Sequence, residues 1–354
     1  GKELTTGTAT GEVTVWNLEA TAVRSLAALS ENALDVPQET SAESDTTEAA
    51  IEPPLLVPNG SAATVATVSP NGKLLAVSGT VEGRPAILVR DLTTGELTAS
   101  LTGHLDQITS LSFAANNRRL ISGSVDQTAR VWDLADAKFP EVISSGGHAA
   151  TISGVAFNSD GSQAATCAAD NSVQLWNTST GEVLQSFVGH TAAVVGIAIT
   201  SSNAEVITAS ADKTVRVWTA ADGKIARTIT APAAISQLAV SRDGTRIAVA
   251  QPDSTVQIYG AADGALAHTL AGHQEAVSIL PFSGDGTRLM SADANRAIVR
   301  DSATGRVLEI LPIAQGISAA VFGATSAEVI LARSDTGINL HSLNFKIALG
   351  EMDK

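Results

Sequence analysis

The chain has 354 residues, of which 44% are hydrophobic and only 3% aromatic, and its formal net charge is −14. No apolar run reaches the 18 or so residues that a membrane helix needs, and no basic stretch provides the positive footprint that a phosphate backbone requires. We therefore expect neither membrane insertion nor a nucleic-acid partner.

A repeat of about 42 residues organises the chain. Three sets have identical internal spacing, with His 28 residues, a hydroxyl residue 10 residues and Asp 6 residues before a Trp. The sets are His104, Ser122, Asp126 and Trp132; His148, Thr166, Asp170 and Trp176; and His190, Thr208, Asp212 and Trp218. The Trp position recurs, in chain order, at Trp16, Arg90, Trp132, Trp176, Trp218, Tyr259, Arg300 and His341.

The first unit, residues 1–29, is expected to be a partial one. Its opening sequence, Gly1 to Leu4, aligns with the turn at residues 71–74, so the unit lacks an innermost strand and the chain is expected to be a fragment of a longer protein. Residues 30–60 follow, with seven acidic side chains, no basic ones and four prolines. This composition predicts an acidic insertion or linker, either merely solvating or binding a partner.

Residues 61–354 are expected to hold seven further units. In residues 148–190, three segments with alternating or apolar character are separated by turn residues and followed by a fourth. This pattern predicts four short antiparallel strands per unit and no helix. One such sheet cannot cover both of its faces, so the units are expected to stack radially into a closed ring.

The period, the Gly-His dipeptides before the first strands and the Trp-Asp or Trp-Asn dipeptides after the third strands resemble the WD40 repeats of β-propellers. The fold class is therefore expected to be all-β, a propeller of four-stranded antiparallel blades. In that family the repeated set forms a hydrogen-bond chain from Asp to His, to the hydroxyl, to the Trp indole. The resemblance implies that these histidines are structural rather than catalytic.

Two blade counts fit the eight units. Either all eight form one ring, which we favour, or residues 61–354 form seven blades and residues 1–29 are a stub. Residues 346–352 align with a fourth strand of the last unit. The unit that ends at Tyr259 lacks the His and the hydroxyl, so apolar packing is expected to hold it. Arg90 and Arg300 occupy the Trp position, and we expect their heads to lie in water with their stems packed.

Catalytic signatures are missing from the sequence. There is no HExxH, GxSxG or phosphate-binding glycine loop. The single cysteine, Cys167, is expected to be a buried, inert thiol. We therefore expect no enzymatic activity, no cofactor and no metal. The alternative, an enzymatic propeller that binds a ligand or cofactor in its central channel, would need polar groups to converge on the first strands, which offer Ser, Thr and Gln only singly.

The expected function is that of a protein–protein interaction scaffold within a larger polypeptide, monomeric as a domain. It would bind a protein, a peptide or another domain of its parent chain. In the WD40 arrangement the fourth-to-first and second-to-third connections share one rim, where loops on a rigid scaffold serve recognition. The candidate rim residues are Asp106, Gln107, Lys213, Gln274, Glu275 and Arg296.

The alanine- and threonine-rich units also resemble bacterial propellers that planctomycete-type proteins carry beside a cytochrome-c-like domain. The segment from Asp136 to Val142 carries that likeness. It implies an extracytoplasmic location and a redox neighbour, although no CxxCH haem-attachment motif is present in these residues.

Overall fold

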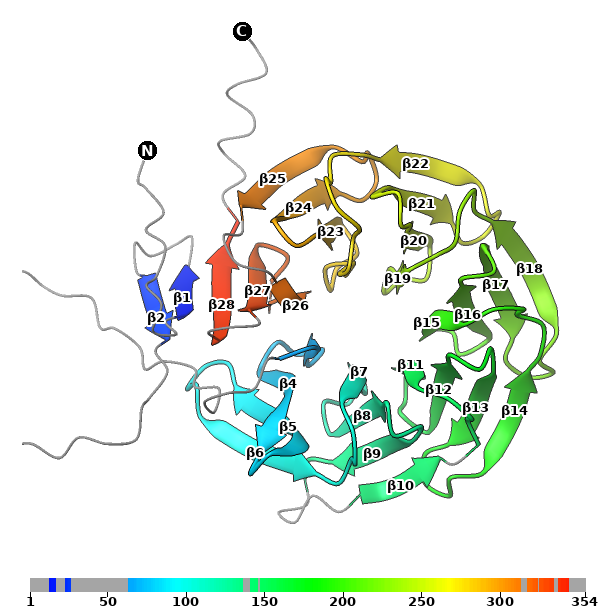
Figure 1. Cartoon of the computed structure of the whole chain (residues 1–354), viewed down its shortest axis with the longest axis horizontal. Helices are drawn as coiled ribbons and strands as arrows, with labels where there is room; N and C mark the ends of the chain where they lie inside the picture. Colours follow the sequence, from blue (N-terminus) through cyan, green and yellow to red (C-terminus); the bar gives the residue numbers. More distant parts are fainter. Residues whose placement is uncertain are drawn as a thin grey trace, which may run out of the picture.

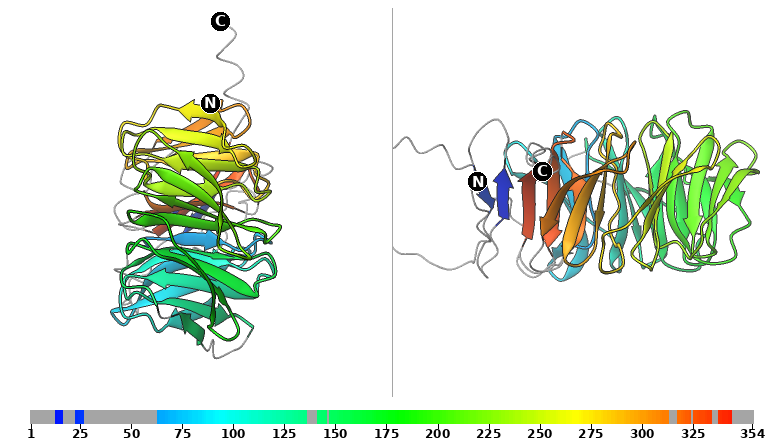
Figure 2. Two further views of the ribbon diagram at one scale, coloured as in Figure 1. Left: turned by 90° about the vertical axis from the view of Figure 1, so that its right-hand side faces the viewer. Right: turned by 90° about the horizontal axis from the view of Figure 1, so that it is seen from above.

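The computed structural model describes residues 13–16, 23–26, 63–135, 141–145, 147–312, 317–323, 325–333 and 337–343. Within these ranges every regular element is a strand. The acidic segment 30–60, residues 136–140 and the tail 346–352 lie outside the described residues. Figure 1 shows the sheets arranged in a ring, with first strands toward the centre and outer strands at the circumference. Seen from the side in Figure 2, the ring is a disc of upright sheets.

Blades 1 to 5 each have four strands that follow one another in the sheet as they do in the chain. Blade 1 consists of β3 (Ala66–Val68), β4 (Leu74–Val81), β5 (Arg84–Asp91) and β6 (Leu97–Thr102). Blade 2 consists of β7 (Ile108–Phe113), β8 (Arg119–Ser124), β9 (Ala129–Asp133) and β10 (Glu141–Ser145). Blade 3 consists of β11 (Ile152–Phe157), β12 (Gln163–Ala168), β13 (Val173–Asn177) and β14 (Val183–Phe187).

Blade 4 consists of β15 (Val194–Ile199), β16 (Glu205–Ser210), β17 (Thr214–Thr219) and β18 (Ile225–Thr230). Blade 5 consists of β19 (Gln237–Val240), β20 (Arg246–Ala250), β21 (Val256–Gly260) and β22 (Leu266–Leu270). These antiparallel meanders match the strand pattern expected from the alternating sequence.

Blade 6 is irregular at its inner edge. Its strands are β23 (Arg288–Ala292), β24 (Arg296–Asp301) and β25 (Val307–Pro312). Isolated bridges from Ile279 to Ala292 and from Phe282 to Leu289 take the place of a regular first strand. Pro281 lies between them, and proline cannot donate a ladder hydrogen bond, which accounts for the interruption.

The last sheet has five strands, in the order β2-β1-β28-β27-β26. The C-terminal part provides β26 (Ile317–Phe322), β27 (Glu328–Arg333) and β28 (Gly337–Ser342). The first unit provides β1 (Val13–Trp16) and β2 (Val23–Leu26), with β1 parallel to β28. We call β26 to β28 blade 7.

The described strands therefore form seven sheets, and the first unit does not make a sheet of its own. The favoured expectation of eight separate blades differs from this topology, which has the form of the alternative, seven blades and a stub. The physical reason is that two strands without an inner partner can be covered only by extending an existing edge, here that of β28.

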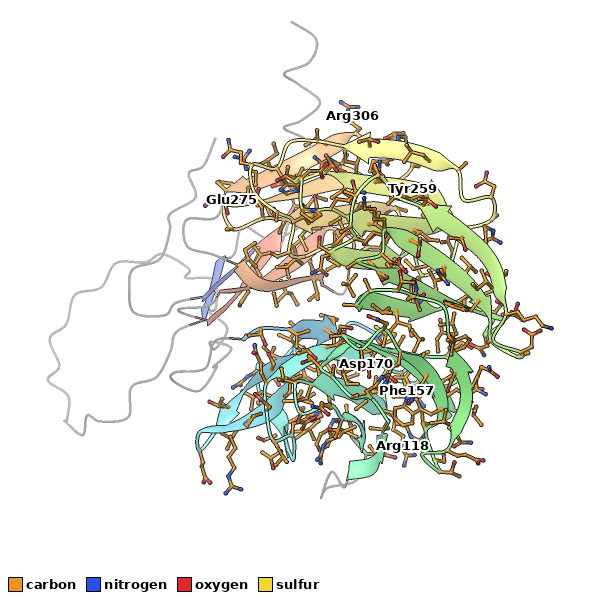
Figure 3. The ribbon with its side chains drawn as sticks, turned by 45° about the vertical axis from the view of Figure 1, so that its right-hand side comes forward. Arg118, Phe157, Asp170, Tyr259, Glu275 and Arg306 are labelled. Atoms are coloured by element: carbon orange, nitrogen blue, oxygen red, sulfur yellow. The ribbon has the colours of Figure 1, made fainter. Side chains whose placement is uncertain are left out.

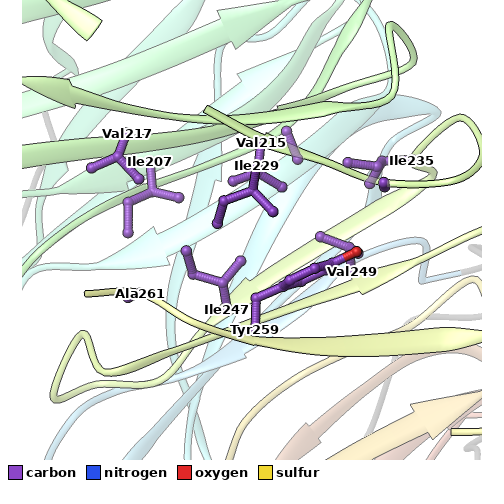
Figure 4. Close-up of a cluster of buried hydrophobic side chains, with 11 residues drawn as sticks. Ile207, Val215, Val217, Ile229, Ile235, Ile247, Val249, Tyr259 and Ala261 are labelled. Atoms are coloured by element: carbon purple, nitrogen blue, oxygen red, sulfur yellow. The ribbon is translucent and has the colours of Figure 1, made fainter. Parts of the chain in front are cut away.

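The hydrophobic core lies between blades rather than within them. One cluster joins Ile207, Val215 and Ile229 of blade 4 to Ile247 and Tyr259 of blade 5 (Figure 4). Another closes the ring by joining blade 1 to blade 7, with Ala63, Leu75, Val77, Ala319 and Ile330. This confirms that each sheet is covered by its neighbours.

Hydrogen bonds also tie neighbouring blades together. Near the centre, the hydroxyl of Thr64 donates to the carbonyl oxygen of Ile108 at 3.1 Å. The hydroxyls of Thr109 and Ser153 donate likewise to Ile152 and Val194. Near the circumference, Arg227 and His268 contact the carbonyl oxygens of Ala261 and Ala303 in the next blade. Both edges of the ring are thus cross-linked.

Candidate functional site

Two of the repeated sets form the complete hydrogen-bond chain. In blade 2, His104 lies 2.8 Å from Asp126 through Nδ1 and 2.7 Å from the Ser122 hydroxyl through Nε2, and the Trp132 indole donates to the same hydroxyl at 2.9 Å. In blade 4 the corresponding distances are 2.8, 2.7 and 2.8 Å. Each set joins the loop before a first strand to the turn after a second strand.

The donor types fix the direction of each chain. An indole N–H can only donate, so the hydroxyl accepts from Trp132 and its own proton points to His104 Nε2. The imidazole is then neutral, with its Nδ1 proton donated to Asp126. Burial lowers the pKa of His104, which favours this neutral form. Burial alone would raise the pKa of Asp126, but hydrogen bonds from Thr128, Leu105 and His104 lower it to about 2.

Blade 3 is wired differently from the expected chain. His148 Nδ1 lies 2.6 Å from the Ser172 hydroxyl, which donates to Asp170 at 2.5 Å. The direct separation of His148 and Asp170 is 3.8 Å. His148 Nε2 still meets Thr166 at 2.8 Å, but the buried indole nitrogen of Trp176 has no hydrogen-bond partner. Here a serine stands between Asp and His, and the tryptophan is not part of the chain.

Blade 6 completes a fourth set with an arginine. His273 contacts Asp293 at 2.9 Å and Ser291 at 2.7 Å. Arg300 donates to the Ser291 hydroxyl at 3.0 Å and to the carbonyl oxygen of Ala271 at 2.5 Å. The guanidinium therefore takes the place of the indole as a pure donor.

The expectation that the heads of these arginines lie in water is wrong. Arg300 is 2% exposed and Arg90 is 6% exposed. Arg90 donates to the carbonyl oxygen of Gly95 at 3.1 Å. Burial lowers the pKa of both guanidinium groups. Neutral carbonyl and hydroxyl oxygens satisfy them, a solution that the residue type alone did not suggest.

Blade 5 replaces the polar set with apolar packing, as expected. Ala231 and Val249 occupy the His and hydroxyl positions and belong to the buried cluster around Tyr259. The Tyr259 hydroxyl donates to Gln257 at 2.6 Å. In Figure 3, Tyr259 lies within the stack of sheets, whereas Arg306 lies at the outer edge of the ring.

The glycine of each Gly-His dipeptide allows a long side chain to pass close by. A β-carbon on Gly103 would lie 2.8 Å from an Arg130 nitrogen, and one on Gly189 would lie 2.2 Å from an Arg216 nitrogen. Arg216 in turn lies 5.7 Å from the centre of the Trp218 ring, a cation–π distance. The glycines thus help to pack these side chains over the polar sets.

The candidate rim residues lie on the loops that the polar sets connect. Asp106, Gln107, Lys213, Gln274 and Glu275 are exposed, and Arg296 is half-buried. Three of them also support the loops themselves. The Asp106 carboxylate accepts a hydrogen bond from the backbone N–H of Gln107 at 2.7 Å, and the Glu275 carboxylate accepts one from the side-chain amide of Asn295 at 3.2 Å. Arg296 donates to the carbonyl oxygen of Gly272 at 3.3 Å.

The sequence reasoning missed two exposed apolar residues on the fourth-to-first connections of this rim. Leu105, directly before Asp106, and Val188, directly before Gly189, are each 86% exposed. The position of Leu105 after a Gly-His dipeptide was the available signal, because the residue there follows a buried histidine into the loop.

Other chemistry is not assembled in the part of the chain that the structure describes. No group of three or more His, Cys, Asp or Glu residues there could hold a metal ion. No helix long and apolar enough to span a membrane is found among these residues. The first-strand hydroxyls of Thr109 and Ser153 are engaged by the next blade. Cys167 is fully buried, and burial raises its pKa to about 12.

Comparisons with known proteins match the repeated blades. The family model described as "WD domain, G-beta repeat" matches residues 95–133, 140–177, 181–219 and 264–299. The chain is 32% identical over 118 residues to the periodic tryptophan protein 2 homolog of Neurospora crassa, covering 32% of this chain and 12% of that protein. It is 36% identical over 107 residues to human WD repeat and SOCS box-containing protein 1, covering 30% of this chain and 24% of that protein.

A third relative is the guanine nucleotide-binding protein subunit beta of Solanum tuberosum, 32% identical over 114 residues, with 30% of each chain covered. The chain thus matches less than a third of the length of each of these relatives. Four matched stretches, the antiparallel four-stranded sheets and the His–Asp–hydroxyl sets are the features that this chain shares with WD40-repeat β-propellers.

Proposed function

We propose that this chain is a non-catalytic protein-interaction scaffold that binds a protein or peptide partner through the rim defined above. The observation that carries the proposal is the rigidity of that rim. Buried His–Asp contacts of 2.8 to 2.9 Å anchor its loops in blades 2, 4 and 6, while Leu105 and charged side chains beside it face outward. Loops held in this way bind without losing much conformational entropy.

The comparisons support the same class of function. The relatives include a G-protein β subunit and a WD repeat and SOCS box-containing protein, and the first of these names describes a part of an assembly. The identity of a partner, the monomeric state, the division of the chain at residues 30 and 60, the cytochrome-c-like neighbour and the extracytoplasmic location remain predictions.

A capture experiment with charge-matched variants tests the proposal. The rim variant is Asp106→Ala, Lys213→Ala, Glu275→Ala. The control variant is Glu96→Ala, Glu182→Ala, Lys224→Ala, in the turns between third and fourth strands, at the end of the sheets opposite the rim. Each removes two acidic side chains and one basic side chain, all exposed. Proteins captured by the full chain should be lost with the rim variant and retained with the control. Equal capture by both variants would contradict a rim-binding function.

Leu105 offers a sharper version of the same test. We expect Leu105 to become fully desolvated on binding, and truncating a side chain that acts as an interface hot spot costs about 2 kcal/mol or more of binding energy. A loss of about 2 kcal/mol corresponds to about thirtyfold in Kd, so Leu105→Ser should weaken partner binding by about that factor. The unfolding midpoint should stay unchanged, because the side chain is 86% exposed.

A further inference from the structure

The aspartate of the repeated set uses its two oxygens in the same way in blades 2, 3, 4 and 6. One oxygen, Oδ1, accepts the backbone N–H two residues later and so closes the turn after the second strand. The other, Oδ2, accepts the backbone N–H of the residue after the histidine, at 2.6 to 3.2 Å. These carboxylates have side chains that are at most 18% exposed: Asp126, Asp170, Asp212 and Asp293.

Blade 5 keeps the turn but lacks both donors to the second oxygen. Asp253 Oδ1 accepts the backbone N–H of Thr255 at 3.1 Å, and Ser254 has φ of 68°, where the equivalent residues of blades 2 to 4 have 68° to 72°. The histidine is replaced by Ala231, and the next residue is Pro232, which has no N–H. All hydrogen bonds that Asp253 accepts within the described residues go to Oδ1, so Oδ2 is without a donor on an exposed side chain.

A second acceptor beside the same turn also lacks a donor. The Thr255 hydroxyl has one proton, which the Asp253 carboxylate receives at 2.6 Å, because a carboxylate can only accept. The Gln251 carboxamide, 3.0 Å from the same hydroxyl, therefore donates to it through its nitrogen. The opposite end of this carboxamide, buried and without a partner, is then its oxygen. The Tyr259 hydroxyl supplies no proton here, because it donates to Gln257 at 2.6 Å.

Blade 5 is thus short of hydrogen-bond donors next to an ionised group. Hydrogen bonds from Thr255 lower the pKa of Asp253, so its carboxylate is charged at neutral pH. Lys213 of blade 4 accepts the backbone N–H of Ala231 at its carbonyl oxygen, at 2.8 Å, but forms no ion pair with Asp253. The missing group is therefore a cationic donor, and the net charge of −14 on the chain favours the approach of one.

We propose that blade 5 receives a lysine side chain of the partner at the position that histidine occupies in the other blades, with the ammonium group donating to Asp253. This inference rests on the rim-binding function above and specifies a basic partner segment. An ammonium group fits better than a guanidinium group, because only one oxygen of Asp253 is free and a guanidinium group pairs best with two. Pro252 in the turn and Pro232 in the loop are exposed and offer apolar surface to the lysine stem.

A titration of the full chain with a single capped lysine, N-acetyl-lysine methylamide, tests the proposal through the backbone amide signals in NMR spectra. The signals of residues 233–236 and 253–255 should shift and saturate. The same compound acetylated on Nζ has no charge and should leave these signals in place.

Two matched variants locate the contact. Asp253→Asn should weaken lysine binding about tenfold or more, because asparagine can still close the turn with its carbonyl oxygen but carries no charge. Asp263→Asn is the control and should bind lysine as the unmodified chain does. Asp263 is likewise exposed and accepts the backbone N–H two residues later at 3.0 Å, but it lies in the turn at the opposite end of blade 5.

Three results would overturn the proposal: no saturable shift at residues 253–255, equal lysine binding by Asp253→Asn and the unmodified chain, or equal shifts at residues 253–255 and 263–265. The last would mean that lysine meets any exposed carboxylate of the chain. The titration needs no partner and is therefore independent of the capture experiment. Saturable lysine binding with capture that ignores the rim would support this site and contradict the scaffold function, and rim-dependent capture without lysine binding would do the reverse.

Discussion

Thr208→Val in blade 4 should destabilise the fold more than Thr166→Val in blade 3. Both threonines are fully buried and occupy the same position in their blades. Thr208 accepts the indole proton of Trp218 at 2.8 Å and contacts His190 Nε2 at 2.7 Å. Valine has the same shape but no hydroxyl, so it leaves both buried groups without a partner.

The expected magnitudes follow from counting those groups. Each buried polar group that loses its partner costs about 1–3 kcal/mol, so Thr208→Val, which affects two groups, should cost roughly 2–6 kcal/mol. Thr166→Val removes only the contact to His148, since the Trp176 indole has no partner to lose, and should cost roughly 1–3 kcal/mol, about half as much. The difference between two otherwise matched substitutions measures the Trp–hydroxyl bond.

Equilibrium unfolding in urea, followed by tryptophan fluorescence, gives both values when the slopes of the two variants agree. Equal losses of unfolding free energy in the two blades would refute the reasoning. It would mean that the indole bond contributes nothing, or that blade 3 has the same wiring as blade 4 in solution. A larger loss for Thr166→Val would refute it more strongly.

Three further predictions follow from the same geometry. Burial lowers the pKa of His104, His190 and His273 in the folded state, so the unfolded chain binds more protons below pH 6.5 and the free energy of unfolding should fall as the pH drops below 6.5. Asp126 and Asp212 have pKa values of about 2 in the folded state against 3.8, so a second loss should follow as the pH falls from 3.8 to 2. Urea midpoints at pH 7.5, 5 and 3 measure both losses. A flat midpoint from pH 7.5 to 5 would contradict the neutral histidines. Arg300→Met should cost roughly 2–3 kcal/mol, because it leaves the Ala271 carbonyl oxygen without its donor and removes one of the two contacts of the Ser291 hydroxyl. Arg300→Trp should cost less, because an indole can still donate to Ser291. Thermal unfolding ranks the two variants, and the reverse order would show that the guanidinium is not an indole substitute. Cys167 should resist alkylation by iodoacetamide in the native state and react after unfolding in urea, and rapid native labelling would contradict its burial and its raised pKa.

The spacing of the repeats was sufficient to predict the strands and the composition of the polar sets, because period and residue type determine which groups can meet. The His–Asp and His–hydroxyl contacts of blades 2 and 4 are of this kind. Blade 3 could not be predicted in the same way. Whether Asp170 contacts His148 directly or through Ser172 depends on the side-chain rotamers of these residues, which the spacing does not encode.

The burial of Arg300 and the position of the first unit could not be predicted from residue type, because both depend on contacts between distant parts of the chain. The burial of Arg300 depends on neutral acceptors, Ser291 and a carbonyl oxygen, that come from separate parts of the chain. A charged group is normally costly to bury, so the residue type alone predicted a solvent-exposed guanidinium group. The place of the first unit depends on which edge was left open, and the edge of β28 became visible only in the assembled ring.

The replacement of a polar set by an apolar cluster in blade 5 gives this ring an uneven response to temperature. Apolar burial weakens on cooling, because its driving force near room temperature is entropic. Blade 5 depends on the cluster around Tyr259, whereas blades 2, 4 and 6 have buried hydrogen bonds that do not share this dependence. Chilling should therefore loosen the joint between blades 4 and 5 first, so that the disc has one cold-sensitive sector, flanked on both sides by blades that keep their buried hydrogen bonds.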